Sequence, residues 1–311
     1  MTCKLCQIEP VYKLPNKTLC KRCFIKYFEN KVFKTIRKYE LFELDDKLVV
    51  AVSGGKDSIS VLYLTHKYLK KKILEKNITA LAIDEGIKNY RKKTLKFLKQ
   101  FCKDLNIKLE IITFKNIFNK TLDESVKILQ KQKNNISPCN ICGTFRRQAL
   151  NIGARKLNAT KLVTGHNTDD EAQNILLNIF KNNFKILTRL GPYNGILRDE
   201  LFIPRVKPLY LITEKEVRLY TILKGFDVGF DECPYAKETF RGNISTMINK
   251  LEDEHKGVKN SIINFYLKTQ YNFKQKFFNE NDTIITYCEK CKEPSQNKIC
   301  NTCKLKELIR D

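Results

Sequence analysis

The stretch AVSGGKDSIS, residues 51–60, combines two glycines, a lysine and an aspartate, a set of residues suited to binding phosphate. It follows a short apolar, β-branched run at 47–52, and apolar residues recur at helical spacing behind it, so we expect a strand, a tight loop and a helix. In such a loop, backbone N–H groups at the glycines converge on phosphate oxygens, and the helix N-terminus and Lys56 add positive charge. The alternative is an ordinary helix cap at Ser53.

This loop differs from the common Walker loop. The pattern G-x-x-x-x-G-K-S/T, aligned on Gly55 and Lys56, would need a glycine at Val50 and a hydroxyl residue at Asp57. The sequence therefore predicts a phosphate site of another class.

Twelve cysteines in a chain without a recognisable secretory leader favour metal binding over disulfides. Eight of them form two sets, each made of two C-x-x-C pairs: Cys3, Cys6, Cys20 and Cys23, and Cys288, Cys291, Cys300 and Cys303. Two such pairs present four thiolates to one ion and close a tetrahedral structural site. We predict two zinc ribbons with one Zn²⁺ each. The alternatives are free thiols paired by chance and redox pairs, and redox pairs normally sit in a βαβ pattern that neither end shows.

Three further cysteines form an incomplete set. Cys139 and Cys142 are expected in a loop after a polar stretch, and Cys233 stands in the run DECPY. Three thiolates leave one coordination position for a substrate or an exogenous ligand. The alternative is three unrelated loop cysteines. The last cysteine, Cys102, lies in a helical pattern and is expected in the core.

The elements that must position these residues follow an alternating pattern. We predict strands at 47–52, 78–84, 107–114 and 161–164, separated by helical patterns such as 90–105 and 144–157. Alternation of this kind is typical of a parallel sheet covered on both faces, whose ligands bind at the carboxyl ends of the strands. Three motifs fall at that edge: SGGKDS, Asp84-Glu85, and the run GHNTDD at 165–170.

The run GHNTDD carries two carboxylates and a histidine. Acidic residues favour a helix N-terminus, which by itself explains one of Asp169 and Asp170. Our hypothesis is that Asp57 and one of these two hold Mg²⁺ on nucleotide phosphates. His166 is either a packed or capping residue or a base, and its role stays open.

Composition sets the outer limits. The chain has 311 residues and a net charge of +24, which indicates a nucleic-acid partner, although a general lysine bias explains part of it. Lysines and arginines of the terminal ribbons and of a predicted helix at 254–276 are candidates for phosphate contacts. The sequence shows no apolar run of membrane-spanning length, so we expect a cytoplasmic protein without a membrane partner.

The motifs occur in a specific order: a four-cysteine ribbon, SGGKDS, PCNICGTFRR, TGHNTDDEAQNILLN, RLGP, ECPY and a second four-cysteine ribbon. In this order they resemble the tRNA 2-thiouridine synthetases of the TtuA and NcsA type, in the PP-loop or N-type ATP pyrophosphatase superfamily. The resemblance implies an adenine nucleotide alpha-hydrolase-like α/β domain at 29–280, flanked by zinc ribbons at 1–28 and 281–311.

The same resemblance implies two sites. Cys139, Cys142 and Cys233 would hold a 4Fe-4S cluster whose fourth iron is free to take sulfide, with Asp170 as a further catalytic residue. The implied ATP site consists of Ala51, Ser53, Gly54, Gly55, Lys56, Asp57, Ser58, Ile83, Arg146, Gly165 and Asp170, and Asp169 joins it through the magnesium hypothesis.

The implied reaction is the ATP-dependent 2-thiolation of a tRNA uridine. Cleavage of ATP to AMP and pyrophosphate would adenylate the C2 oxygen, and sulfur would replace it; the expected position is the wobble uridine, with the T loop as the alternative. The sulfur donor would be sulfide or a ubiquitin-like thiocarboxylate carrier, and the expected assembly is a homodimer. Alternatives are a persulfide on Cys142 or Cys233 in place of the cluster, thiolation of a cytidine, or an iron–sulfur and zinc protein that binds nucleic acid under regulation by ATP.

Overall fold

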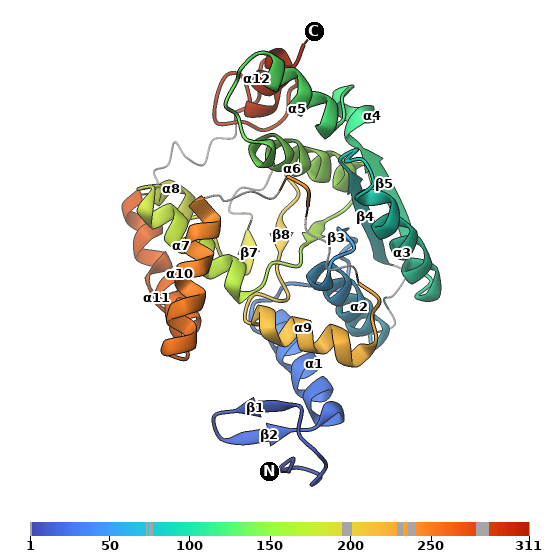
Figure 1. Cartoon of the computed structure of the whole chain (residues 1–311), viewed down its shortest axis with the longest axis vertical. Coiled ribbons are helices and arrows are strands. Elements are labelled where there is room, and N and C mark those ends of the chain that lie inside the picture. The colour runs from blue at the N-terminus through green and yellow to red at the C-terminus, as the bar shows by residue number, and fades with distance from the viewer. Residues whose placement is uncertain are drawn as a thin grey trace.

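The structure is a computed structural model, and it describes residues 2–72, 74, 77–194, 201–228, 233–235, 240–277 and 286–310 (Figure 1). In chain order its elements are β1 (Tyr12–Leu14), β2 (Lys17–Leu19), α1 (Lys21–Lys38), β3 (Leu48–Val52), α2 (Lys56–Lys70), β4 (Ile78–Asp84), α3 (Arg91–Asp104), β5 (Lys108–Thr113), α4 (Phe114–Phe118), α5 (Leu122–Lys131), α6 (Pro138–Lys156), β6 (Lys161–Val163), α7 (Thr168–Phe180), α8 (Phe184–Leu187), β7 (Tyr193–Asn194), β8 (Arg205–Val206), α9 (Glu214–Lys224), α10 (Phe240–Glu254), α11 (Val258–Phe277) and α12 (Asn301–Leu308).

A six-stranded sheet forms the centre, with the strand order β5-β4-β3-β6-β8-β7. All neighbours pair in parallel except the edge strand β7, which runs antiparallel to β8. The four predicted strands and the parallel sheet are confirmed. Strands β7 and β8 were not predicted, because two-residue strands are too short to show a periodic pattern.

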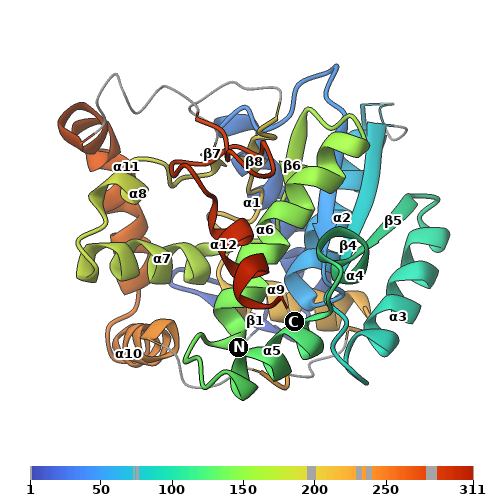
Figure 2. The same ribbon diagram turned by 90° about the horizontal axis from the view of Figure 1, so that it is seen from above.

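Alternate strand residues point to opposite faces, and helices cover both faces. Val50 and Ala80 face one cluster, which includes residues of α1, α2, α3 and α9. Val49 and Leu81 face the other cluster, formed with α4, α5 and α6. Helix α12 packs against α6 on that side (Figure 2). Cys102 is 1% exposed and lies in the first cluster, so its assignment to the core is confirmed.

Helices α7, α8, α10 and α11 form a separate group with its own small core (Figure 1). Tyr266 of α11 is buried there and donates to the carbonyl of Leu187 at 2.7 Å. The predicted helix at 254–276 begins later, at Val258, because Gly257 takes a φ of +100° and ends the preceding segment. Among the described helices, none is both long enough and apolar enough to span a bilayer.

The two four-cysteine sets lie at opposite ends of the molecule (Figure 1). The first lies around the β1–β2 hairpin, and α1 continues from it into the body of the protein, so the predicted boundary at residue 28 falls inside a helix. The second is joined to α6 by an ion pair between Arg155 and Glu293. The predicted boundary at 280 lies outside the described residues.

Cys139 and Cys142 lie in the first turns of α6, so their placement in a loop was wrong. Ser137 caps this helix by accepting a hydrogen bond from the backbone N–H of Asn140 at 3.3 Å. Pro138 is its first residue, a position where the missing N–H costs nothing. The two cysteines therefore stand on a rigid element.

Gly153 sets how closely α6 approaches the sheet. A Cβ there would lie 2.7 Å from a methyl of Ile112 and 2.8 Å from one of Leu81. We expect Gly153→Val to lower the free energy of unfolding by about 1–3 kcal/mol through overpacking. Gly143→Val on the same helix, where a Cβ would meet only the end of the Arg147 side chain at 3.4 Å, should change it by less than about 0.5 kcal/mol. Chemical denaturation measures both, and equal effects would contradict this account of the packing.

Candidate active site

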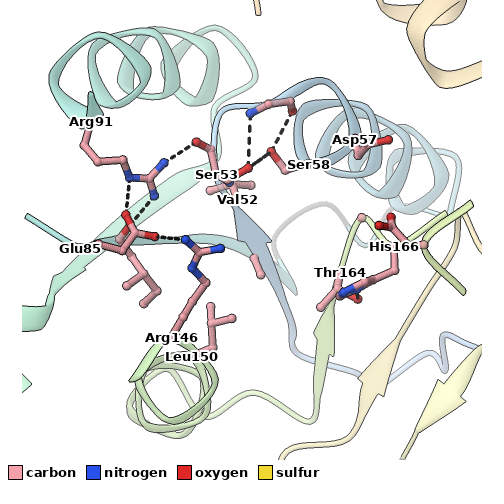
Figure 3. A pocket seen from close by; sticks show the side chains of 15 residues that line it. Val52, Ser53, Asp57, Ser58, Glu85, Arg91, Arg146, Leu150, Thr164 and His166 are labelled. Carbon is pink, nitrogen blue, oxygen red and sulfur yellow. Dashed lines mark hydrogen bonds and ion pairs between the residues drawn. The ribbon is translucent and has the colours of Figure 1, made fainter. Parts of the chain in front are cut away.

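A cavity of about 260 Å³ opens at the carboxyl ends of β3, β4 and β6 (Figure 3). The predicted ATP-site residues that line it are Ala51, Ser53, Gly55, Asp57, Ser58, Ile83, Arg146, Gly165 and Asp170. Three others, Gly54, Lys56 and Asp169, are absent from its lining. The cavity therefore brings most of the predicted set together at the expected edge of the sheet.

Ser58, in the first turn of α2, ties the phosphate loop together. Its hydroxyl oxygen accepts hydrogen bonds from the backbone N–H groups of Ser53 at 3.1 Å and Gly54 at 3.2 Å, and it donates to the carbonyl of Gly55 at 2.9 Å. Gly54 has a φ of +87°, which an L-residue adopts only with strain. Ser58 thus fixes the conformation of the loop, and the N-terminus of α2 is the part that offers N–H groups without intrahelical partners to an anion.

The turn after β6 lies directly against this loop. A Cβ added at Gly165 would lie 2.9 Å from the carbonyl carbon of Asp57 and 3.1 Å from the nitrogen of Ser58. Because these are backbone atoms, they cannot move aside as a side-chain end can. Gly165 therefore sets the spacing between the two loops that form the walls of the cavity.

The two aspartates of the GHNTDD run have different surroundings. Asp170 lines the cavity with Asp57, and Asn167 joins them: it donates to Asp57 at 3.0 Å and accepts from the N–H of Asp170 at 3.1 Å. Asp169 points elsewhere, forming an ion pair with Lys259 and accepting from the N–H of Glu214 at 2.8 Å. Its predicted place in the ATP site is not supported by this geometry, because its carboxylate joins α9 and α11 to α7.

Burial and neighbouring charges shift the pKa values of Asp170 and His166. Burial raises the pKa of Asp170 to about 6, with Arg241 acting in the opposite direction. Desolvation within the cavity and the nearby cations Lys207, Arg205 and Arg241 lower the pKa of His166, although part of its ring is exposed to solvent. The shift favours the neutral ring, whose Nδ1 lies 2.9 Å from the hydroxyl of Thr164.

Lys56 lies beside the cavity in a bridge between carboxylates. Its Nζ lies 2.8 Å from Asp57 and 2.9 Å from Glu214. The positive charge of Lys56 is therefore present at the loop as expected, and the carboxylates of Asp57 and Glu214 balance it.

A buried carboxylate connects the loop to the cysteine helix (Figure 3). Glu85 follows β4, its side chain is 2% exposed, and its oxygens lie 2.7 Å from Arg91 Nε and 2.8 Å from a guanidinium nitrogen of Arg146. Arg91 also donates to the carbonyl of Ser53 at 2.7 Å. Arg146 donates to the Sγ of Cys142 at 3.2 Å. One network thus runs from the phosphate loop to a predicted cluster ligand.

The three remaining predicted ligands share one neighbourhood. Cys142 is buried in the same cluster against which Cys233 and Tyr235 pack, and Cys139 Sγ lies 3.5 Å from the carbonyl oxygen of Tyr235. Among the described residues their sulfurs do not all approach within 4.8 Å, as those of each ribbon do. A four-iron cluster spreads its thiolates wider than one ion does, so the cluster stays a prediction for these three cysteines.

The ribbon cysteines fit one tetrahedral ion each. Within each set all four sulfurs lie within 4.8 Å of one another, with Cys6 and Cys20 at 3.3 Å and Cys291 and Cys300 at 3.6 Å. Four thiolates around zinc, with Zn–S bonds of about 2.3 Å, would stand about 3.8 Å apart. The two predicted groupings are confirmed, and the identity of the ion stays a prediction.

Sequence reasoning missed several residues of the cavity. Arg91, Leu150 and Thr164 line it, and Glu85, noted only as part of a motif, lines it as well. Arg91 is the first residue of a helix and gives no local signal, because its role depends on contacts with residues far away in the sequence.

The fold and cavity together define an α/β nucleotide-binding protein of the PP-loop class. A family model described as a PP-loop domain matches residues 26–251. The chain is 36% identical over its whole length to a tRNA-5-methyluridine(54) 2-sulfurtransferase of Pyrococcus horikoshii, 95% of which is covered. It is 33% identical to the tRNA 2-thiolation protein NcsA of Haloferax volcanii, with 94% of this chain and 93% of that protein covered.

A solved structure matches at full length. It is the U34-tRNA thiolase NcsA of Methanococcus maripaludis with its 4Fe-4S cluster, 31% identical, with a TM-score of 0.81 over 99% of this chain and 96% of that one. The chain therefore belongs to the PP-loop family, in the group of tRNA thiolation proteins that these relatives represent.

We expect Glu85→Gln to lower the free energy of unfolding by about 3 kcal/mol and to weaken ATP binding, because the charges of Arg91 and Arg146 lose their buried counter-charge. Thermal denaturation and ATP titration measure the two effects. The control is Glu124→Gln, whose partner Lys115 is exposed, and it should cost less than about 1 kcal/mol. Equal losses at both positions would refute the role given to the buried network.

Proposed function

We propose that the chain is a tRNA-uridine 2-sulfurtransferase, which cleaves ATP to AMP and pyrophosphate and forms 2-thiouridine. The observation that carries the proposal is the place of Arg146, which lines the nucleotide cavity and contacts Cys142 at 3.2 Å. A site for activating an oxygen and a thiolate set for handling sulfur therefore share one residue. The names of the relatives support the same reaction.

The cavity accounts for the activation step. The C2 oxygen of uracil is a poor leaving group, and adenylation makes it part of departing AMP. The N-terminus of α2, whose first N–H groups have no intrahelical partner, would stabilise the charge that develops on pyrophosphate, and the hydrogen bonds from the Ser53 and Gly54 N–H groups to Ser58 hold the loop in place for it. Asp57 and Asp170 are the proposed ligands of Mg²⁺, because both face the cavity and Asn167 orients them.

The cysteine set accounts for sulfur handling. Cys139, Cys142 and Cys233 are the proposed ligands of a 4Fe-4S cluster, which when bound supplies a sulfur carrier and Lewis acid without net redox change. Burial raises the pKa of the Cys142 thiol to about 11, and Arg146 acts against this rise. Binding of metal must displace that proton, and the adjacent guanidinium favours the thiolate.

Several finer points belong to this proposal. The wobble uridine is the position to test first, because the structural neighbour that covers nearly the whole chain is named a U34 thiolase, whereas a relative of similar identity acts on position 54. Sulfide or a ubiquitin-like thiocarboxylate carrier as donor, a homodimer, and one Zn²⁺ in each ribbon stay predictions. A cytoplasmic location is supported by relatives such as the cytoplasmic tRNA 2-thiolation protein 1 of Dictyostelium discoideum, 35% identical over 97% of this chain.

Anaerobic purification followed by iron, acid-labile sulfide and zinc analysis tests the metal assignment. We expect about four irons and two zincs per chain, and Cys139→Ala should lose iron while keeping zinc. Cys102→Ala is the matched control, because Cys102 is buried in the other cluster and should keep both metals. If strictly anaerobic wild type contained zinc but no iron, the cluster assignment would be wrong and the persulfide mechanism would take its place.

Thiolation of a tRNA transcript in the presence of ATP, Mg²⁺ and sulfide tests the reaction itself. Wild type should form 2-thiouridine at position 34, and Cys233→Ala should form none while still binding ATP, since Cys233 lies outside the nucleotide cavity. Mass spectrometry of nuclease digests identifies the modified position. Product at position 54 would correct the position only, whereas full activity in the variant would remove Cys233 from the mechanism.

A further inference from the structure

A second concavity, of about 640 Å³, lies beside α3 and adjoins the nucleotide cavity. Lys88, Lys92, Lys96 and Lys99 line it, and all four are exposed. Arg91 lines both this groove and the nucleotide cavity, so the two hollows meet at the start of α3. In Figure 1, α3 lies at the outer side of the sheet next to β5. We call this surface the α3 groove.

The charges of the α3 groove are not neutralised within the described chain. None of its four lysines forms an ion pair with a described residue, and Asp84 is the one acidic residue in its lining. Lys92, Lys96 and Lys99 are spaced four and three residues apart, so they share one face of the helix. Like charges at this spacing repel, and an external polyanion would relieve that repulsion.

A comparison with another basic concavity singles out this one. A hollow of the same volume, about 640 Å³, lies between the N-terminal ribbon and α1 and is lined by Lys17, Arg22, Lys26, Lys31 and Lys34. Lys31 is paired there with Glu216 at 2.8 Å, and the hollow shares no residue with the nucleotide cavity. RNA bound only at the ribbon would not be led directly to the reacting atoms.

We propose that the α3 groove holds the tRNA backbone next to the target uridine and leads that base into the nucleotide cavity. This inference rests on the proposed function and adds the surface that presents the substrate. A uridine must leave its stack before its C2 oxygen can reach a buried site, and phosphate contacts beside it fix its position. Lysines bind phosphates as point charges, which suits a backbone without sequence readout.

The test is the triple variant Lys92→Gln, Lys96→Gln, Lys99→Gln, with tRNA affinity measured at several salt concentrations. We expect affinity to fall on the order of tenfold to a hundredfold, and the slope of log affinity against log salt to become shallower by about 2, since each lost phosphate contact removes about 0.7–0.9. ATP affinity should stay unchanged, which shows that the variant is folded. Single-turnover thiolation should slow at low tRNA concentration and recover when tRNA is raised.

The matched control is Lys70→Gln, Lys108→Gln, Lys156→Gln. These exposed lysines lie at the end of α2, the start of β5 and the end of α6, near the amino ends of the parallel strands, and their removal changes the net charge equally. Equal effects of the two triple variants on the salt slope would refute the role of the α3 groove in binding tRNA. Unchanged tRNA affinity in the groove variant would refute it as well. Wild type that binds tRNA without thiolating it would instead refute the proposed function, while the binding comparison would still decide the groove.

Discussion

The arrangement of the site depends on one buried carboxylate. Glu85 is almost fully buried at the end of β4, where an unpaired carboxylate would be strongly unfavourable. Its charge is balanced by Arg91 from α3 and Arg146 from α6, two helices that pack on opposite faces of the sheet. Arg91 also donates to the carbonyls of Ser53 and Ile83. If either arginine moved away, the buried carboxylate of Glu85 would lose part of its counter-charge. The pairing therefore holds the carboxyl ends of the strands in one geometry.

This constraint matters because the proposed reaction has two parts that must meet at one atom. In this proposal the phosphate loop would bind the nucleotide that activates the C2 oxygen of uracil, and the cysteine set would deliver sulfur to the C2 carbon. Arg146 lies between them, in contact with Glu85 and with Cys142. Because the two groups are held at a fixed spacing, they need not be brought together in each reaction. Such preorganisation can supply much of the rate enhancement of a reaction between two components. Gly165 also helps to fix this spacing, because the absence of a side chain allows the backbones of two loops to come into contact.

The sequence predicts local features well and long-range contacts poorly. The strand before SGGKDS, the alternating elements and the two four-cysteine sets are local patterns, and they are found where expected. The helix start at Pro138 was missed, although Ser137 and Pro138 form a recognisable cap. Asp169 and Asp170 are adjacent in sequence, yet successive helical residues point about 100° apart, so one faces the cavity and the other faces Lys259. No spacing rule decides which, since the answer depends on how α9 and α11 pack against α7.

The net charge, like the local sequence patterns, does not by itself define the binding site. A net charge of +24 attracts any polyanion over a distance set by salt, and it is spread too widely to choose one uridine. Selection must come from surfaces where shape and charge coincide beside the reacting atoms. The α3 groove meets that condition through Arg91, which is tied to the phosphate loop at one end of its guanidinium and lines the groove as well. A residue that anchors the nucleotide loop thus also borders the surface proposed for RNA, so substrate binding and activation would be adjusted through the same side chain.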